Sequence, residues 1–292
     1  MSRYRFIQGE KAAYPITLLC RVLGVARSAY YAWTRREVSA RATADEALTD
    51  QISAAYTRSR RTYGAPRIHA ELQAGGVRCA RKRVARLMRA AGLVGCHRRR
   101  RARTTVADPA HTPAPNLVAR DFAAAGPDRL WLGDITYVAT REGWLYLAVL
   151  LDAHSRRIVG WAMADHLRTE LALDALTMAL ARRRPGAGLV HHTDRGCQYT
   201  AAAYRQVLAA RGVTASMSRS GNCLDNAMAE SFFATLKAEI ADAQLWPNRA
   251  AARTAIFEWI EAFYNRQRRH SALAYQPPVA FEENVLLSCP AA

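Results

Sequence analysis

Three acidic residues and one lysine in the second half of the chain have the types and spacing of a metal-dependent phosphoryl-transfer site. Asp134 lies inside an apolar run, where a carboxylate is costly to bury unless it binds a metal ion or a partner. Asp194 ends another apolar run, 35 residues separate it from Glu230, and Lys237 lies two helical turns beyond Glu230 on the same face. Clustered carboxylates repel one another unless cations neutralise them. Such hard oxygen ligands suit Mg²⁺ or Mn²⁺, and two ions about 4 Å apart can hold the attacking and leaving oxygens of a phosphodiester.

The pattern of apolar residues predicts the elements that must bring these groups together. Three strand-like runs, at 129–140, 144–153 and 156–164, follow one another with short connections, which favours an antiparallel meander. Beyond them the pattern predicts, in order, a helix at 168–184, a strand at 189–194, a helix at 201–211, a strand at 213–218 and a long helix at 225–241. This order predicts an α/β fold, a mixed five-stranded sheet flanked by helices and preceded by an all-α region.

The charge of the chain is concentrated in its first half. The 292 residues carry 42 Lys+Arg against 24 Asp+Glu, a net charge of +18. Residues 1–120, with 24 basic and 7 acidic residues, account for +17, and residues 121–292 for +1. A basic surface attracts polyanions, and a general preference for arginine would not stop at one point in the chain. Nucleic-acid binding by the first half is therefore favoured over a role of the arginines in solubility.

Cysteine usage and hydropathy favour a soluble protein of a reducing compartment. The six cysteines are scattered, with no Cys-x-x-Cys pair and no histidine at zinc-finger spacing. The longest apolar run, 144–151, is far shorter than the ~18 residues of a membrane span, and no secretory signal opens the sequence. We expect a cytoplasmic, nucleoid-associated protein that does not bind membranes.

Two segments of the basic half have the helix-turn-helix pattern of DNA-binding proteins. In residues 16–36, a glycine separates two short helices, and Arg27 and Ser28 begin the second, at the end that usually meets base edges in the major groove. In residues 62–92, the last helix has one apolar face and one basic face, and the sequence has no acidic residue between Glu71 and Asp108. The apolar face carries Val84, Leu87, Met88 and Ala91, and the basic face carries Lys82, Arg86 and Arg89.

An Arg- and Pro-rich stretch joins the two halves. Its four consecutive arginines, Arg98, Arg99, Arg100 and Arg101, are expected to contact the DNA backbone without sequence preference. The predicted organisation is a helix-turn-helix segment at 1–42, a second, basic helix-turn-helix domain at 43–96, a linker at 97–120, the sheet domain with a C-terminal helix at 121–282, and a tail at 283–292.

Several stretches of the sequence resemble one known family. GDIT at 133–136, HTDRGCQYT at 192–200 and SMSRSGNCLDNAMAESFFATLK at 216–237 resemble the catalytic core of transposases encoded by the second reading frame of IS3-family insertion sequences. MSRYRFI at 1–7, PNLVARDFAAAGPDRLW at 115–131 and YNRQRRHSALAYQPPVAF at 264–281 extend the resemblance over nearly the whole chain. That core is similar to the retroviral integrases and has an RNase-H-like fold.

The resemblance implies a DDE-type polynucleotidyl transferase. Asp134, Asp194 and Glu230 take the positions of the metal-binding triad, with Asp134 bridging two Mg²⁺ or Mn²⁺ ions, and Lys237 takes the position that holds a DNA phosphate. Water and then a DNA 3′-hydroxyl would attack a phosphodiester, which cuts the element ends and joins them to target DNA. The implied partners are double-stranded DNA, further copies of the chain for pairing two ends, and the product of an upstream reading frame fused to this one.

Two other functions fit part of the sequence. A DNA-binding regulator with an inactive nuclease-like half would not need all four residues of the site. An RNase-H-like ribonuclease or a junction resolvase would not need two helix-turn-helix segments suited to duplex DNA. Departures from the family pattern spare the triad: Gly133 stands where threonine is common, and Ala274 where glycine is usual.

Other polar and aromatic residues near the site have more than one interpretation. Asn226, one turn before Glu230, either positions substrate or caps the helix, and capping is favoured. His192 is expected to pack rather than to tune a metal ligand. The residues Arg195, Gln198 and Tyr199 either contact DNA or cap a local turn, and Tyr264, Asn265, Arg268, His270 and Ser271 are either structural or DNA contacts. The alternating aromatic residues Trp131, Trp144, Tyr146 and Trp161 are expected in the core.

Overall fold

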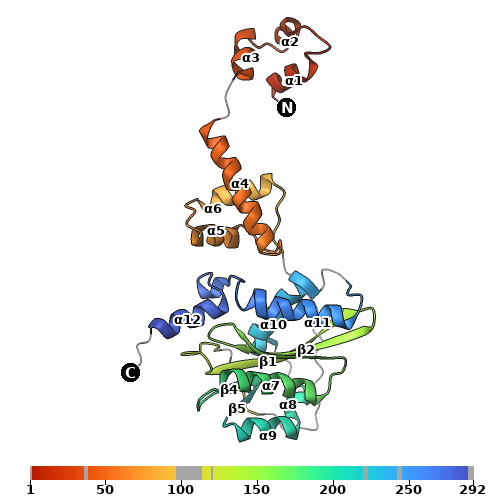
Figure 1. Cartoon of the computed structure of the whole chain (residues 1–292), viewed down its shortest axis with the longest axis vertical. Coiled ribbons are helices and arrows are strands. Elements are labelled where there is room, and N and C mark those ends of the chain that lie inside the picture. The colour runs from red at the N-terminus through yellow and green to blue at the C-terminus, as the bar shows by residue number, and fades with distance from the viewer. Residues whose placement is uncertain are drawn as a thin grey trace.

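The computed structural model describes residues 2–35, 39–96, 114–119, 121–219, 223–241 and 245–288. Two units of three helices come first, and a sheet domain, residues 121–288, follows them (Figure 1). None of the helices in these ranges is long and apolar enough to cross a membrane. The predicted DNA-backbone contacts Arg98, Arg99, Arg100 and Arg101 lie outside the described residues.

The sheet domain contains the mixed five-stranded sheet that the sequence predicts. Its strands are β1 (Leu130–Thr140), β2 (Gly143–Asp152), β3 (Ile158–Ala164), β4 (Val190–Thr193) and β5 (Thr214–Met217), in the order β3-β2-β1-β4-β5. β1, β2 and β3 form an antiparallel meander, whereas β4 pairs parallel to β1 and β5 parallel to β4. β1 is therefore a central strand, which suits its apolar sequence.

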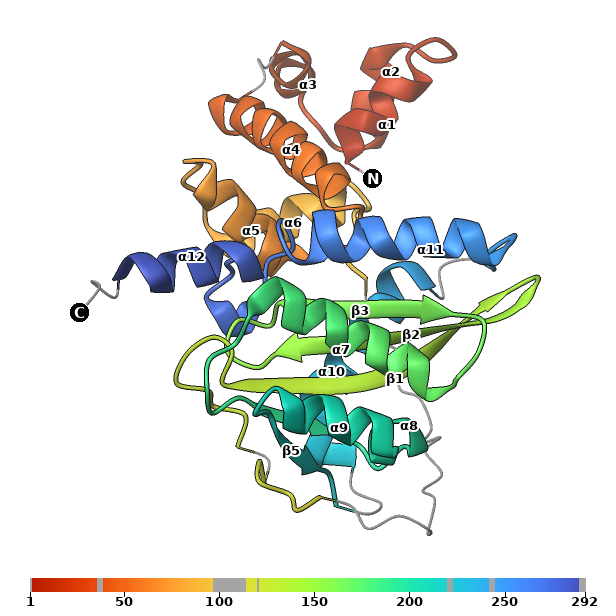
Figure 2. The ribbon, with the colours of Figure 1, turned by 60° about the horizontal axis from the view of Figure 1, so that its bottom comes forward.

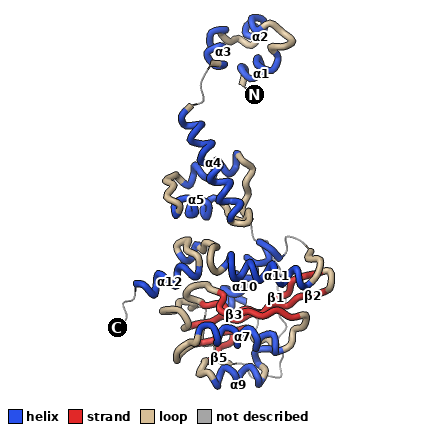
Figure 3. The backbone as a smooth tube through the Cα atoms, in the orientation of Figure 1, coloured by secondary structure: helices blue, strands red, loops and turns tan. Residues whose placement is uncertain are grey.

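Helices cover both faces of this sheet. Figure 1 views the sheet edge-on, and Figures 2 and 3 show the same layers. One layer contains α10 (Ala227–Leu236) and α11 (Arg249–Glu258), and the other contains α7 (Thr169–Arg183), α8 (Cys197–Thr200) and α9 (Ala202–Ala210). Because side chains alternate along a strand, Leu130 and Leu132 pack with the α10 layer and Trp131 with the α7 layer.

The long helix predicted at 225–241 is divided into three parts. A 3₁₀ turn, η1 (Cys223–Asn226), precedes α10, and a π-helical turn, η2 (Lys237–Ala241), follows it. A second π-helical turn, η3 (Trp259–Tyr264), continues α11, and the 3₁₀ turn η4 (Ser271–Leu273) and α12 (Pro278–Ser288) follow it in sequence. Single π-turns inside helices occur frequently at functional sites, and η2 begins at Lys237.

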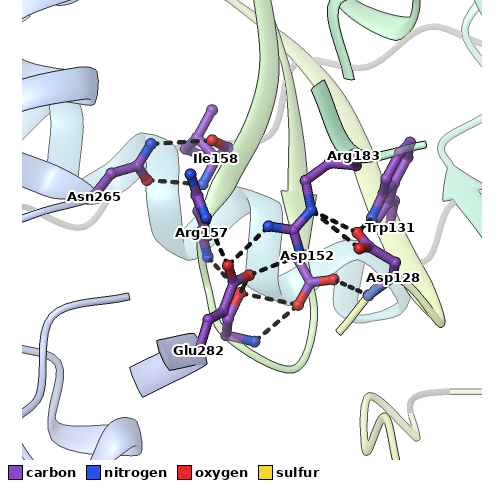
Figure 4. Close-up of polar contacts among 9 residues, drawn as sticks. Asp128, Trp131, Asp152, Arg157, Ile158, Arg183, Asn265 and Glu282 are labelled. Atoms are coloured by element: carbon purple, nitrogen blue, oxygen red, sulfur yellow. Dashed lines mark hydrogen bonds and ion pairs between the residues drawn. The ribbon is translucent and has the colours of Figure 1, made fainter. Parts of the chain in front are cut away.

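A buried group of charged residues ties α12 to the sheet (Figure 4). Glu282 of α12 lies 2.7 Å from Arg157 and 2.8 Å from Arg183, measured from carboxylate oxygen to guanidinium nitrogen. Arg183 also pairs with Asp128 at 2.9 Å, and the Asp152 carboxylate accepts the backbone N–H of Asp128 at 2.8 Å. These five residues are called the arginine-paired cluster below. Their bonds hold the last described helix to the ends of β1 and β2.

Both predicted helix-turn-helix segments are present, and one more helix precedes each of them. The first helical unit contains α1 (Arg3–Glu10), α2 (Ile16–Val22) and α3 (Arg27–Thr34), and the second contains α4 (Ala40–Arg58), α5 (Ala65–Ala74) and α6 (Arg81–Ala90). Gly24, between α2 and α3, has a φ of +65°, which glycine adopts without strain. Ile7 of α1 packs with Cys20 and Tyr30, so the added helix covers the apolar side of the pair.

The second helical unit is bonded directly to the sheet domain. Tyr63 Oη accepts a hydrogen bond from the backbone N–H of Arg269 at 2.7 Å, and Arg67 Nε donates to the Arg269 carbonyl at 3.0 Å. The Arg269 guanidinium forms an ion pair with Glu71 of α5. Specific contacts therefore place this unit on the sheet domain, in addition to the chain that joins them.

Residues 114–119, inside the predicted linker, lie along the sheet domain. Asn116 Nδ2 donates to the buried carboxylate of Asp225 at 2.9 Å, and the Leu117 backbone N–H donates to Ser216 Oγ at 2.9 Å. Ser216 belongs to β5, so this segment follows the β5 side of the sheet.

One of the four aromatic residues expected in the core is at the surface. Trp131 is fully buried, and Tyr146 and Trp161 are partly buried, but Trp144 is 49% exposed. The expectation for Trp144 is wrong because this residue lies at the tip of the β1–β2 hairpin. β3 pairs with β2 only as far as Tyr146, so Trp144 projects beyond it.

Candidate active site

Asp134 and Asp194 are brought together by the register of two parallel strands. Leu132 of β1 pairs with His192 of β4, and the same register carried two residues further places Asp134 beside Asp194. The Asp134 carboxylate accepts the backbone N–H of the next residue at 2.8 Å, and the Asp194 carboxylate accepts the N–H two residues on at 2.9 Å. Strand pairing and backbone hydrogen bonds thus fix both half-buried side chains.

The unusual glycine before Asp134 has a local cause. A Cβ at Gly133 would lie 2.7 Å from Cε1 of His191 and 3.1 Å from Cγ2 of Thr193. His191 is fully buried, and its Nε2 is hydrogen-bonded to Tyr204 Oη at 2.8 Å, so its ring has little room to move. Burial lowers the pKa of His191 to about 4, which keeps the ring neutral at pH 7. The strands of the two aspartates pair this closely because residue 133 has no side chain.

α10 carries Glu230 and is anchored beside Asp134 through Asn226. Asn226 occupies the N-cap position, but its side chain caps no helical N–H, and Nδ2 instead donates to the Gly133 carbonyl at 3.2 Å. The prediction that Asn226 caps the helix is wrong because β1 offers its side chain a backbone acceptor. Its Oδ1 is buried without a hydrogen-bond partner among the described residues. Glu230, one turn further on, is exposed.

Burial and the mutual repulsion of the carboxylates both disfavour negative charge at the site. Burial and then the charge of Asp194, with a smaller effect of Glu230, raise the pKa of Asp134 well above its usual value, and Lys237 offsets only part of this. Burial likewise raises the pKa of Asp194. In the described part of the chain, no three His, Cys, Asp or Glu side chains already stand close enough to hold a metal ion. The donors are hard oxygens whose repulsion a cation would relieve, so these residues fit Mg²⁺ or Mn²⁺.

Lys237 lies at the edge of the carboxylates. Its Nζ is 4.7 Å from the ring centroid of Tyr137, which follows Asp134 by three residues on β1. In the same π-helical turn, Glu239 forms a buried ion pair with Arg268, with 2.7 Å between Oε1 and Nη2. This pair holds η2 against the segment after η3. Sequence reasoning missed Tyr137, whose only signal was an aromatic residue near the end of a predicted strand.

The neighbouring polar residues mostly serve the fold. His192 is buried, with Nδ1 2.8 Å from Ser216 Oγ and Nε2 3.1 Å from Ser218 Oγ, so the prediction that it packs is confirmed. Gln198 is buried and donates to a backbone carbonyl before α7, and Tyr199 lies in the α7-side core. The family-like residues Tyr264, Asn265 and Arg268 are also buried, which favours their structural interpretation.

Four of the predicted DNA contacts lie at the surface of the helical units. Arg27 and Ser28 are exposed in the first turn of α3. Lys82 and Arg89 are exposed on α6, on the side away from its buried residues. The helix-turn-helix geometry therefore leaves these side chains accessible to a duplex.

Arg86 has an acidic partner that sequence reasoning missed. Asp45 of α4 lies 2.6 Å from Arg86 Nη2 and 2.7 Å from Arg83 Nε. Hydrogen bonds from Arg86 and then Arg83 lower the pKa of Asp45. The pattern of residues 62–92 could not reveal this, because the acid comes from a helix earlier in the chain. Arg41, Lys82, Arg83 and Arg86 line one open hollow between α4 and α6.

Sequence families and known proteins match both halves of the chain. The profile of an HTH-like domain matches residues 43–101, and two profiles of the integrase core domain match residues 124–223 and 211–278. The transposase InsF for insertion sequence IS3A of Escherichia coli (strain K12) is 41% identical over 286 residues, covering 97% of this chain and 99% of that protein. The insertion element IS600 uncharacterized 31 kDa protein of Shigella sonnei is 47% identical over 266 residues, covering 91% and 97%.

Among solved structures, the simian T-cell lymphotropic virus intasome in complex with PP2A regulatory subunit B56 gamma aligns with 73% of this chain and 69% of that chain, at 16% identity and a TM-score of 0.46. The HTLV-2 integrase catalytic core domain in complex with magnesium aligns with 51% and 94%, at 15% identity and a TM-score of 0.38. The identity with InsF extends over almost the full length of both proteins. The chain therefore belongs to the transposases of IS3-family insertion sequences, with an integrase core domain behind an HTH-like domain.

Proposed function

We propose that this transposase cuts DNA at the ends of its element and transfers the freed 3′-ends into target DNA, with Asp134, Asp194 and Glu230 as metal ligands. The observation that carries the proposal is the β1–β4 register, which aligns two acids on neighbouring strands beside a helix anchored to β1. Their all-oxygen donors and raised pKa values fit two Mg²⁺ or Mn²⁺ ions. When bound, such ions stabilise the negative charge that develops around the phosphorus.

Each residue of the site then has a definite task. Asp134 and Asp194 form its fixed part, because strand pairing and backbone N–H groups hold them. Glu230, exposed on α10, turns toward them and completes the donor set. Lys237 binds a DNA phosphate next to the scissile bond and so orients the strand for in-line attack. In each step a new bond forms between phosphorus and the oxygen of water or of a 3′-hydroxyl, and the bond to the departing 3′-oxygen breaks.

The helical units supply the DNA contacts in this proposal. Arg27 and Ser28, at the start of α3, fit base edges in a major groove, whereas Lys82, Arg86 and Arg89 of α6 fit phosphates. The arginines at 98–101 belong to the same backbone-binding set. A duplex bound there reaches the carboxylates as part of one complex, because the second unit is bonded to the sheet domain.

Assembly is a separate part of the proposal. Joining two element ends in one event requires at least two copies of the chain on DNA, and fusion to the product of an upstream reading frame would add end recognition. Gel filtration of DNA complexes tests the first point. Two DNA ends with two or more protein chains are expected, and complexes of one chain with one DNA would contradict it.

The chemistry is tested by nicking and strand joining on supercoiled plasmid. Purified full-length chain is incubated with Mg²⁺ or Mn²⁺, alongside the Asp194→Asn and Glu230→Gln variants. Asp174→Asn on α7 and Glu258→Gln on α11 are matched controls, because both acids are exposed outside the site. We expect cation-dependent nicking that both site variants abolish and both controls retain. Wild-type activity in either site variant would refute the assignment of metal ligands.

A further inference from the structure

The tip of the β1–β2 hairpin exposes two aromatic rings that touch each other. Tyr137 is 41% exposed, Trp144 is 49% exposed, and their ring centroids lie 4.8 Å apart in an edge-to-face arrangement. β4 pairs with β1 only from Leu130 to Leu132, and toward the turn β3 pairs with β2 no further than Tyr146. Beyond these pairs the hairpin is two-stranded, apart from a bridge between Thr140 and Trp246. Neighbouring exposed rings of this size point to a binding surface, because their contact with water is unfavourable.

This tip is braced by α11. Arg249, the first residue of α11, donates from Nε to the Trp144 carbonyl at 3.1 Å and from its backbone N–H to the Glu142 carboxylate at 3.0 Å. Within the turn, Thr140 Oγ1 donates to the Gly143 carbonyl at 2.7 Å. Both strands of the tip are thus fixed before anything binds. Stacking of a ligand on the rings therefore costs little conformational entropy of the protein.

The rings stand next to the proposed active site. Lys237 Nζ lies 4.7 Å from the centroid of the Tyr137 ring, and the same ammonium group acts on Asp134. Tyr137 follows Asp134 by three residues of β1, about 10 Å at ~3.3 Å per residue and on the opposite face of the strand, so Lys237 is the group that links the two. Successive phosphates of one DNA strand are about 3.4 Å apart along the duplex axis. A strand with a phosphate on Lys237 therefore has bases within reach of Tyr137 and Trp144.

We propose that Tyr137 and Trp144 form a stacking platform for an unpaired nucleobase of the DNA strand that enters the active site. The inference rests on the proposed function, because that function places a DNA strand at Lys237. Every base has a π-face, so such stacking holds a strand whatever its sequence. Lys237 contacts the Tyr137 ring and Arg249 bonds the Trp144 carbonyl, and these positive charges match a phosphodiester strand rather than an apolar protein surface.

The platform is tested by binding measurements in which either the Trp144 ring or the DNA base is removed. The probe is a labelled duplex with a short single-stranded extension of either thymidines or abasic nucleotides, and affinity is measured by fluorescence anisotropy without divalent cations. Both extensions carry the same phosphates, so only the bases differ. We expect the wild-type chain to bind the thymidine extension about tenfold more tightly. Trp144→Ala should bind both extensions equally, and Trp144→Phe should keep most of the preference.

The controls separate this proposal from folding and from catalysis. Phe257→Ala removes another exposed ring, at the far end of α11, and should keep the tenfold preference. Asp194→Asn should also keep this preference while losing plasmid nicking. The binding preference and the nicking activity are therefore measured independently. No preference in the wild-type chain, or an unchanged preference in a folded Trp144→Ala variant, would overturn the platform whether or not the protein nicks DNA.

Discussion

Acids near the two ends of β1 are treated in opposite ways by the fold: Asp128 and Glu282 share an arginine partner, whereas Asp134 and Asp194 repel each other. In the arginine-paired cluster, Glu282 is almost fully buried, and it lies within 2.8 Å of two guanidinium groups (Figure 4). Burial raises the pKa of Glu282, but hydrogen bonds from Arg183, Ser155 and Arg157 outweigh it and lower that pKa overall. At the candidate active site, burial and repulsion raise the pKa of Asp134, and the nearby lysine does not compensate.

The contrast separates acids that build structure from acids that are available for chemistry. Buried carboxylates with their own arginine partners are neutralised within the fold and fasten α12 to the sheet. The carboxylates of the site are held by strand register and backbone N–H groups, which fix position without cancelling charge. Positive charge from outside is thus favoured at the second group and not at the first.

Replacing Asp134 with asparagine tests the contrast most strongly. Asp134→Asn keeps the acceptor for the backbone N–H but removes a proposed metal ligand, so nicking should fall on the order of a thousandfold. In urea unfolding without divalent cations, the same variant should gain on the order of 1 kcal/mol in the free energy of unfolding, because it removes a buried charge that Asp194 repels. Asp174→Asn is the control for both measurements. A clear loss of stability in Asp134→Asn would show that this acid is structural after all.

Removing the central arginine of the other cluster should have the reverse outcome. Arg183→Met leaves Glu282 and Asp128 without their shared partner, and breaking a buried pair of this kind costs about 3 kcal/mol in the free energy of unfolding. Arg182→Met is a matched control, because its ion pair with Glu261 is more solvent-exposed than those of Arg183 and should be worth about 1 kcal/mol or less. Equal destabilisation by the two substitutions would show that the buried ion pairs of Arg183 stabilise the fold no more than the ion pair of Arg182.

The pH dependence of unfolding sharpens the same point. The folded pKa of Glu282 is lower than its unfolded value near 4.5, so its contribution to stability is present above about pH 4.5. That contribution is lost as the pH falls through the folded pKa. Urea unfolding of the wild-type chain from pH 7 to pH 3 should therefore lose stability at the acid end. Glu282→Gln should show a smaller loss over that range, and an identical loss would contradict the assignment.

The smallest expected effect compares two asparagines at helix starts. Asn226 bonds the Gly133 carbonyl and does not cap α10, whereas Asn248 caps α11, its Oδ1 accepting the Ala251 N–H at 2.7 Å. Alanine at either position should destabilise the protein by about 1 kcal/mol. Only Asn226→Ala should also slow nicking, by about tenfold, because it loosens the helix that carries Glu230. Parallel activity and unfolding measurements on both variants separate these roles.

The sequence predicted the sheet and its helices because apolar alternation and helix periodicity are local properties. It also indicated which acids could act together, through their positions on predicted strands and a helix. The exposure of Trp144 could not be predicted from alternation, since it depends on where β3 stops pairing. The acid beside Arg83 and Arg86 could not be predicted either, because Asp45 reaches them only through helix packing. Local sequence patterns thus predict the helices and strands, whereas the contacts of their side chains depend on how these elements pack together.

The attachment of the second helical unit through Tyr63, Arg67 and Glu71 has a consequence for exchanging DNA specificity between related elements. These three side chains bond the segment around Arg269, and the adjacent Arg268 pairs with Glu239 in the turn that begins at Lys237. An HTH-like domain grafted from another transposase would be placed correctly on the integrase core domain only with matching residues at those three positions. The design of such chimaeras must therefore preserve the residues of this interface, and choosing a junction in the sequence is not enough.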